Sequence, residues 1–452
     1  MTKMKARKFQ YLIAMAVLSL APMAGRLAAQ DQPSQAAPPH YSVSNLGTFG
    51  GKVSSGNSIN NLGWAMGNAN PAGDATTQAA LWIDGKAIKL GTLGGPNSAI
   101  EWPVKNDWGV IAGIAETAEI DPLKEDWSCS GFFPAPATKH ICLGFVTRWG
   151  RLQALPTLGG EHGYASGVNE RGESVGWAET NVHDKTCVLP QILQFEAVFY
   201  DADGRVHELP PLPEDQDGAA TAINNQGQVV GISGTCDVAI GAYTAKRMVI
   251  WQDGFPFEIP AFGGSGWNTP TAINNRGEVV GFANLPGDVV DGVLQFNPVA
   301  FIWTPQRGTT KIEPLSGDTN SIAYGINDRG QVVGQSYGGP EGSRAFIWQD
   351  GKAYDVNGLI PTSSPLYLLY AEGINDRGEI TGQACVVSAC TTETPAFLAV
   401  PEFSWFNSNA DALAVVDKDS SATAVRLAVP RDVIQKTLKR RGLHVDAPLQ
   451  QR

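Results

Sequence analysis

One phrase, repeated seven times along the chain, constrains its fold more than any other feature. The phrase is an apolar run that ends in Asn, a turn that closes with Gly three residues later, and a short apolar strand that closes with a second Gly. Its copies begin at Asn60, Asn106, Asn169, Asn224, Asn274, Asn327 and Asn375. A repeat of roughly 50 residues indicates supersecondary units that stack on one another, because one such unit cannot bury its apolar faces alone.

The stretch 321–357 shows how one unit divides into strands. The four strand candidates are 321–327, 331–335, 344–348 and 352–356. Short segments rich in β-branched and aromatic residues, separated by turns that end in Gly330 and Gly351, predict an antiparallel meander. The third strand is apolar on both faces. It must therefore be covered on both sides, which happens when each small sheet lies between two neighbours.

The two ends of the repeat region predict a closed ring. Residues 41–51 match the fourth-strand phrase at 89–95 but precede the first unit, and the seventh unit, which ends at 396–401, lacks a fourth strand of its own. A leading strand that completes the last sheet leaves no terminal face bare. The sequence therefore predicts an all-β fold, a seven-bladed β-propeller of four-stranded antiparallel blades from 41 to 403, closed by an N-terminal strand.

Two segments carry a family resemblance. Residues 327–334 read Asn-Asp-Arg-Gly-Gln-Val-Val-Gly, and residues 90–95 read Leu-Gly-Thr-Leu-Gly-Gly. In these segments the chain resembles the bacterial repeat family called probable extracellular, HAF family, named for a His-Ala-Phe start of the third strand. Here that motif reads Val299-Ala300-Phe301, Arg344-Ala345-Phe346 and Pro395-Ala396-Phe397, without the His. The resemblance covers nearly all of 41–400 and implies a secreted repeat protein, with no established activity.

The N-terminal residues are typical of a cleaved secretory signal. Four basic residues between Lys3 and Lys8 precede an uncharged stretch, 11–25, that is too short and interrupted for a good membrane span. We predict a signal peptide at 1–29, a linker at 30–40 and a secreted or periplasmic mature chain without a transmembrane segment. An uncleaved anchor is the alternative. After 403 the repeats stop, and 404–452 is predicted to be a partly helical, basic C-terminal tail.

Charge and cysteine content narrow the partners and the compartment. Residues 1–29 hold five of the 33 basic residues and none of the 44 acidic ones, so the mature chain is strongly acidic, which disfavours nucleic acid and anionic membranes. Six cysteines without Cys-x-x-Cys spacing favour disulfides in an oxidising compartment over a metal cluster. All lie in loops between second and third strands. By loop they group as Cys129 with Cys142, Cys187 with Cys236 in adjacent blades, and Cys385 with Cys390. Six cysteines allow 15 pairings, so the connectivity stays open until the fold is known.

Loop lengths predict which face carries a site. The Asn-x-x-Gly and Asp-Gly turns are tight and share one face, whereas the crossovers and the long second-to-third loops share the other. Functional residues concentrate on long loops, so the second face is favoured. The positions seven residues before each repeat Asn differ between units and are expected to ring the channel mouth. The candidate ligand-binding residues are His162, Asp217, Trp267 and Asn320 at these positions, with Glu161, Glu214, Trp102 and Trp127 nearby.

A rim of aromatic and carboxylate side chains suits sugar binding, because indole faces stack on sugar rings and acids accept hydrogen bonds from hydroxyl groups. The sequence therefore favours a monomeric binding or scaffold module for a glycan or an envelope protein, without a cofactor or metal. The alternative is a carbohydrate-active enzyme, a glycoside hydrolase or lyase, that uses Glu161, Glu214 and Asp217.

Simpler interpretations stand beside these. Trp267 equally fits a loop filler, and His162 fits a hydrogen-bonded surface residue. Asp328, Asp350 and Asp376 fit turn formers. No Gly-x-Ser-x-Gly elbow, P-loop, His-Glu-x-x-His or calcium-loop pattern occurs in the sequence, so no catalytic residue is assigned.

Overall fold

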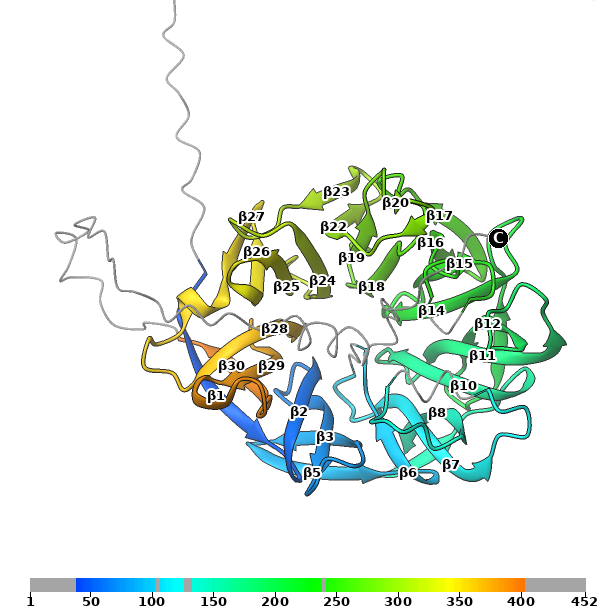
Figure 1. The fold of residues 1–452 in the computed structure, drawn as a ribbon, viewed down its shortest axis with the longest axis horizontal. Coiled ribbons are helices and arrows are strands. Elements are labelled where there is room, and N and C mark those ends of the chain that lie inside the picture. Colours follow the sequence, from blue (N-terminus) through cyan, green and yellow to red (C-terminus); the bar gives the residue numbers. More distant parts are fainter. Residues whose placement is uncertain (1–37, 103–105, 126–131, 149, 238–240, 403–452) are drawn as a thin grey trace, which may run out of the picture. The chain divides into compact units, whose positions relative to one another are not determined.

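Seven four-stranded antiparallel sheets are arranged as blades around a central axis (Figure 1). The computed structural model describes residues 38–102, 106–125, 132–148, 150–237 and 241–402. In these ranges the only helical segments are two short 3-10 turns, η1 (Val356–Leu359) and η2 (Val387–Ala389). The predicted seven-bladed propeller is confirmed. The predicted signal peptide at 1–29 and tail at 404–452 lie outside the described residues.

Blades 1 to 4 each use four consecutive strands. Blade 1 consists of β2 (Gly50–Ile59), β3 (Ala65–Pro71), β4 (Gln78–Ile83) and β5 (Lys86–Gly91). Blade 2 consists of β6 (Gly94–Ala99), β7 (Ala112–Ile120), β8 (His140–Arg148) and β9 (Arg151–Ala154). Blade 3 consists of β10 (Gly159–Val168), β11 (Ser174–His183), β12 (Leu193–Tyr200) and β13 (Val206–Leu209). Blade 4 consists of β14 (Asp217–Ile223), β15 (Val229–Gly234), β16 (Arg247–Gln252) and β17 (Phe255–Ile259).

The last three blades depart from this plan in two places. Blade 5 consists of β18 (Thr269–Ile273), β19 (Val279–Asn284), β22 (Pro298–Thr304) and β23 (Gly308–Ile312), with a hairpin of β20 (Val289–Val290) and β21 (Val293–Leu294) inserted between β19 and β22. Blade 6 consists of β24 (Asn320–Ile326), β25 (Val332–Gly339), β26 (Gly342–Gln349) and β27 (Lys352–Asp355). Blade 7 takes only β28 (Leu366–Ile374), β29 (Ile380–Val386) and β30 (Ala396–Pro401) from the end of the chain.

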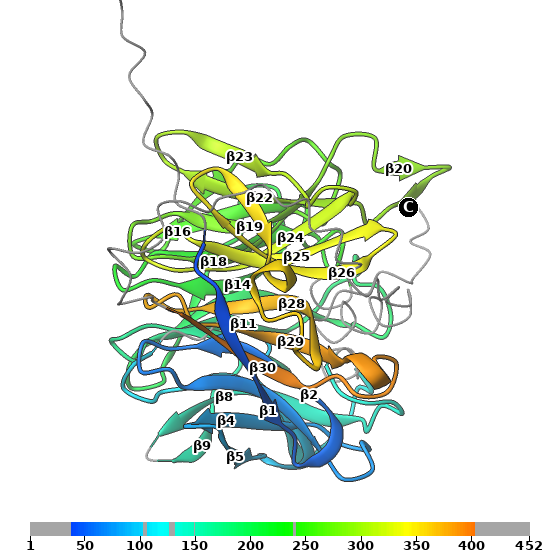
Figure 2. The same cartoon turned by 90° about the vertical axis from the view of Figure 1, so that its left-hand side faces the viewer.

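The fourth strand of blade 7 comes from the start of the repeat region. Strand β1 (Tyr41–Gly47) pairs antiparallel with β30, so that Tyr41 lies opposite Pro401 and Asn45 opposite Phe397. Figures 1 and 2 show the blue β1 beside the orange β30 at this seam. The Tyr41 side chain is 1% exposed and packs into the core of blades 6 and 7. The predicted closure by an N-terminal strand is therefore confirmed.

The repeat Asn closes each turn and joins it to the next blade. In blade 6, Asn327 Oδ1 accepts hydrogen bonds from the N–H groups of Arg329 (3.1 Å) and Gln331 (3.0 Å), while Nδ2 donates to the carbonyl oxygen of Asn375 in blade 7 (2.9 Å). The same bond from Asn Nδ2 to the next Asn carbonyl recurs at all seven turns, ending with Asn375 to Asn60. Asparagine suits this position because its side-chain amide both accepts hydrogen bonds within the turn and donates one to the next blade.

The two glycines of the repeat serve different needs. The first, such as Gly330, has φ of 81°, a conformation that other residues rarely adopt. The second, Gly334, faces a β-bulge between Ala323 and Gly325, where a Cβ atom would lie 2.0 Å from the carbonyl oxygen of Ile322. All seven second glycines would place a Cβ atom within 2.3 Å of a carbonyl oxygen. The second glycine of the repeat is therefore required because there is no room for a Cβ atom at this position.

Candidate functional site

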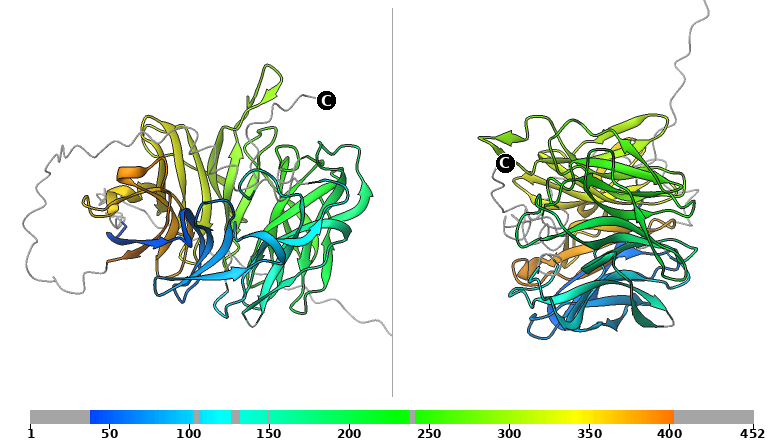
Figure 3. Two further views of the ribbon diagram at one scale, coloured as in Figure 1. Left: turned by 60° about the horizontal axis from the view of Figure 1, so that its bottom comes forward. Right: turned by 90° about the vertical axis from the view of Figure 1, so that its right-hand side faces the viewer.

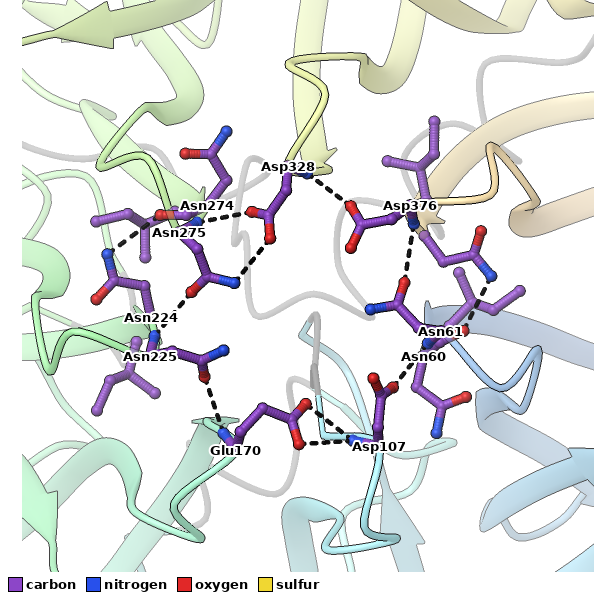
Figure 4. Close-up of a pocket in the computed structure, with 15 residues that line it drawn as sticks. Asn60, Asn61, Asp107, Glu170, Asn224, Asn225, Asn274, Asn275, Asp328 and Asp376 are labelled. Carbon is purple, nitrogen blue, oxygen red and sulfur yellow. Dashed lines mark hydrogen bonds between the residues drawn. The ribbon is translucent and has the colours of Figure 1, made fainter.

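A polar cavity opens on the axis at the face of the tight turns. Its volume is about 270 Å³, and turns from all seven blades line it (Figure 4). The lining contains Asn, Asp, Glu and Ile side chains and no lysine or arginine. A cavity of this composition offers many hydrogen-bond acceptors around one central space.

The residue after each repeat Asn forms the rim of this cavity. Its side-chain oxygen accepts a hydrogen bond from the backbone N–H of the equivalent residue in the preceding blade, at 2.8–2.9 Å around the whole ring. The rim residues are Asn61, Asp107, Glu170, Asn225, Asn275, Asp328 and Asp376. Burial, together with the neighbouring Asp107 charge, raises the pKa of Glu170 above its ordinary value. Four carboxyl groups make the rim acidic.

Sequence reasoning favoured the opposite face and missed this cavity. It treated Asp328 and Asp376 as turn formers, which they also are. The signal that points to the rim is that every repeat Asn is followed by Asn, Asp or Glu. The turn itself needs no side-chain hydrogen-bond acceptor at that position. An acceptor that recurs there in all seven units therefore indicates a contact with a neighbouring blade.

His162 and Glu161 belong to a network between blades 2 and 3. The imidazole is fully buried, its Nδ1 accepts the Cys142 N–H (3.1 Å), and its Nε2 lies 3.5 Å from Asp121 Oδ2. The N–H groups of Glu161 and His162 both donate to Glu179 Oε2, at 3.1 and 2.8 Å. Burial raises the pKa of Glu179 to about 7. His162 therefore helps to hold the long loop of blade 2 against blade 3.

Asp217, Glu214 and Asn320 lie at crossovers of blades 4 and 6. The Asp217 side chain is fully buried, and its Oδ1 accepts the Phe195 N–H (3.2 Å). Glu214 is exposed and has φ of 78°, at a position where blade 6 has Gly317 with φ of 90°. Asn320 is 9% exposed, and its Oδ1 accepts the Thr319 hydroxyl (2.7 Å).

The candidate tryptophans are covered by loop residues. Trp267 is 2% exposed and packs edge-on against Phe296, with ring centroids 5.2 Å apart. Trp102 is 7% exposed and lies in a cluster with Phe132. Trp127 lies outside the described residues. The structure thus joins His162 and Glu161 in one network. Asp217 and Glu214 share the crossover into blade 4, whereas Asn320 lies at the crossover into blade 6. The role of the candidate residues as ligand contacts stays a prediction.

The predicted disulfide bonding is confirmed, and the structure supplies two pairings that the sequence left open. Cys187–Cys236 joins the long loops of blades 3 and 4, with Cα atoms 4.4 Å apart, and Cys385–Cys390 closes a short loop of blade 7, with Cα atoms 4.6 Å apart. Cys142 is also disulfide-bonded, while Cys129 lies outside the described residues. Disulfides fit the oxidising compartment that the sequence predicts.

Removing these disulfides should have unequal effects. A cross-link stabilises mainly by restricting the unfolded chain, and more so for longer loops. The Cys187–Cys236 bridge spans 49 residues and Cys385–Cys390 spans five. We expect the Cys187→Ser/Cys236→Ser variant to lose about 4 kcal/mol of unfolding free energy, and the Cys385→Ser/Cys390→Ser variant about 2 kcal/mol. Urea unfolding of both variants measures this difference, and a larger loss in the second would contradict it.

Large aliphatic side chains are exposed on the long loops between second and third strands and on the strand ends that lead into these loops. We call this surface the loop face. These side chains are Ile120, Val182, Leu189, Leu285, Val289, Val290, Val293 and Val387, and Leu189 reaches 77% exposure. The β20–β21 hairpin carries three of them, and Figures 2 and 3 show that it projects beyond the neighbouring loops. The loop face therefore combines braced loops with an accessible apolar surface.

Among the described residues, no three His, Cys, Asp or Glu side chains are grouped so as to hold a metal ion. Across the same part of the chain, no helix has the length and apolar character needed to cross a bilayer.

The fold defines this chain as a seven-bladed β-propeller closed by its N-terminal strand. Among solved structures it is similar to virginiamycin B lyase from Staphylococcus aureus, with TM-score 0.46, 11% identity and coverage of 80% of this chain and 99% of that one. It is also similar to a streptogramin B lyase (TM-score 0.43, 11% identity, coverage 80% and 98%) and to a chain of a mitotic checkpoint complex (0.41, 10%, 86% and 99%). No protein-family model and no curated protein matches the sequence.

Proposed function

We propose that this propeller is an exported binding or scaffold module that contacts an envelope protein through its loop face. One observation carries the proposal. Of the 13 large hydrophobic side chains exposed within the described ranges, eight lie on the loop face. Exposed apolar side chains gathered on one face of a protein mark sites of interaction with other proteins.

The surroundings of these side chains support the same role. The Cys187–Cys236 and Cys385–Cys390 bridges brace three of the loops, so less conformational entropy is lost when a partner binds. Export is supported by these disulfides and by the predicted signal at 1–29. Membership of the HAF-repeat family stays a prediction that would fit a secreted protein.

A glycan ligand and carbohydrate chemistry have less support. Stacking on a sugar needs an accessible indole face, and Trp102 and Trp267 are 7% and 2% exposed. Glycoside chemistry needs two carboxyl groups about 5–10 Å apart on either side of the substrate. Glu214 is exposed, whereas the Asp217 side chain is fully buried.

Charged substitutions on the loop face should weaken partner binding. We expect the Leu189→Asp/Val290→Asp variant to bind solubilised envelope proteins at least tenfold more weakly than the wild type, because each aliphatic side chain contributes about 1.5–3 kcal/mol when buried. The measurement is cross-linking of the purified mature chain to an envelope extract, quantified over a concentration series. Circular dichroism of the variant checks that the fold is kept.

The matched control is Ile88→Asp, which places the same charge on β5, away from the loop face, at a side chain that is 43% exposed. This variant should bind like the wild type. Equal loss in both variants would contradict the loop-face assignment. Saturable binding on a glycan array, unaffected by Leu189→Asp/Val290→Asp, would instead establish the glycan function.

A further inference from the structure

The last described strand ends on the face that carries the axial cavity, which we call the turn face. The 375–378 turn joins β28 to β29 at this face, and the antiparallel β29 and β30 then run away from it and back to it. A Cβ atom placed on Gly378 would lie 3.8 Å from Pro401, the last residue of β30. The chain after residue 402 therefore starts beside the turn that carries the rim residue Asp376.

The rim of the axial cavity holds negative charge without a nearby counter-charge (Figure 4). Its four acids are Asp107, Glu170, Asp328 and Asp376. Within the described ranges, the ion pairs made by lysine and arginine side chains use other acids. Carboxylates gathered around a concave surface concentrate the field there and attract cations.

The other acids of the seven turns are already neutralised. In blades 3, 5 and 7 the turn carries an Arg and a Glu that form an ion pair at 2.5–2.6 Å: Arg171–Glu173, Arg276–Glu278 and Arg377–Glu379. Blade 6 has the exposed Arg329 with Gln331 in place of the Glu. From each repeat Asn to the fourth residue after it, the turns hold seven acids and four arginines, a net charge of -3. This excess lies at the rim.

Blades 1 and 2 carry exposed apolar side chains beside the rim. At the position of these arginines they have Leu62 and Trp108, which are 51% and 80% exposed. The two turns are adjacent, since the Asn61 N–H donates to Asp107 Oδ1 at 2.8 Å. Indole faces bind cations, and exposed apolar side chains mark contact surfaces. The turn face thus fits a partner that combines positive charge with aliphatic groups.

The segment 431–441 of this chain has that composition. It lies outside the described residues, and its sequence is Arg-Asp-Val-Ile-Gln-Lys-Thr-Leu-Lys-Arg-Arg. Five basic residues against one acid give a net charge of +4, and Val433, Ile434 and Leu438 are aliphatic. The 28 residues from 403 to 430 separate it from the described fold. At the rise of a helix they span about 40 Å, whereas β30 and β28 are two strand spacings, about 10 Å, apart.

We propose that residues 431–441 dock on the turn face of the same chain. Their lysine and arginine side chains lie over the acidic rim, and their aliphatic side chains pack against Leu62 and Trp108. The docked segment covers the mouth of the axial cavity. This contact is independent of the partner proposed above, because the loop face lies at the opposite ends of the strands.

Carbodiimide cross-linking of the mature protein tests the contact, because this reagent joins a lysine amine directly to a carboxyl group. The linked peptides are quantified by mass spectrometry. We expect Lys436 and Lys439 to be joined to the rim acids at least ten times as often as to Asp84 and Asp253, which are exposed acids in outer turns of the same face. Equal yields would overturn the proposal.

Two further outcomes of the same experiment would also overturn it. In about 1 M salt the Debye length falls to about 3 Å, so the rim links should decrease at least fivefold, and an undiminished yield would contradict docking by charge. In a mixture of protein labelled with nitrogen-14 and nitrogen-15, the links should stay within one copy. Rim links that join the two labels would assign the segment to a second copy of the chain instead.

A rim variant with a matched control locates the contact. Asp107→Asn/Asp376→Asn removes two rim charges and keeps the acceptors for the Asn61 and Asp328 N–H groups. Links from the segment to the remaining rim acids should fall at least fivefold. Asp84→Asn/Asp253→Asn removes the same charge at φ of 48° and 52°, where asparagine is tolerated, and should keep the wild-type yield. Equal losses in both variants would overturn the proposal.

Two more variants test the partner surfaces separately. Lys439→Glu/Arg440→Glu leaves the propeller unaltered, and links from Lys436 to the rim should fall at least fivefold. Trp108→Ser should lower the rim links at least twofold, whereas Phe255→Ser, at a side chain that is 68% exposed in an outer turn, should not. Rim links that persist at the wild-type yield in Lys439→Glu/Arg440→Glu would overturn the docking of this segment.

Discussion

Replacing Gly334 with alanine is expected to lower the free energy of unfolding by about 3 kcal/mol, near the top of the range for overpacking. The new Cβ atom would lie 2.0 Å from the Ile322 carbonyl oxygen and 2.6 Å from the Phe346 ring. The oxygen belongs to the bulged backbone of β24 and the ring is 1% exposed, so neither has room to move. Urea denaturation followed by fluorescence measures the loss.

The matched control for Gly334→Ala is Gly358→Ala. No atom lies within 4 Å of a Cβ placed at Gly358, and its φ is outside the left-handed region. We expect this variant to stay within about 0.5 kcal/mol of the wild type. Similar losses in both variants would show that the close approach to the bulge does not determine stability.

Replacing Asn327 with aspartate should cost about 3 kcal/mol at pH 7, the order expected for an unpaired buried charge. The substitution keeps an oxygen for the N–H groups of Arg329 and Gln331 but puts a second oxygen where Nδ2 now donates to the Asn375 carbonyl. Asn327 is fully buried, so the repulsion is not screened by water.

The effect of Asn327→Asp should depend on pH with a definite sign. Burial and the facing carbonyl raise the pKa of the new carboxyl group, so the protonated form, which can donate, is favoured in the fold. The loss relative to wild type is therefore smaller at pH 4 than at pH 7. Asp376→Asn keeps the acceptor for the Asp328 N–H at the rim and should be nearly neutral. A pH-independent loss in Asn327→Asp would contradict the proposed bond.

The repeat made much of the fold predictable from the sequence. Blade number, strand order and the closing β1–β30 pair follow from counting phrases and noticing that residues 41–51 complete a unit that lacks a strand. These features belong to the repeat unit, whose copies and missing strand can be counted in the sequence. The sequence grouped the cysteines by loop, but the fold was needed to establish the Cys187–Cys236 and Cys385–Cys390 pairs.

The candidate sites depended on packing between segments that are distant in the sequence. His162 and Trp267 occupy crossover positions that a bare propeller would leave open, but Asp121 contacts the first and Phe296 covers the second. Loop residues outside the repeat period carry no signal of where they pack. The axial rim was missed for a related reason, since the contact of Asp328 with Asn275 arises only when two blades stand side by side.

The β1–β30 pairing also determines when during synthesis the ring can close. The hydroxyl of Ser42 bonds to the carbonyl of Val400, 358 residues further along the chain. At synthesis rates of about 5–20 residues per second, the first strand to leave the ribosome waits roughly 20–70 s before its partner exists. Throughout that interval its edge has no native neighbour. Ring closure is therefore a late event, and a chain truncated before residue 396 would retain an open seam that only a chaperone or another chain can cover.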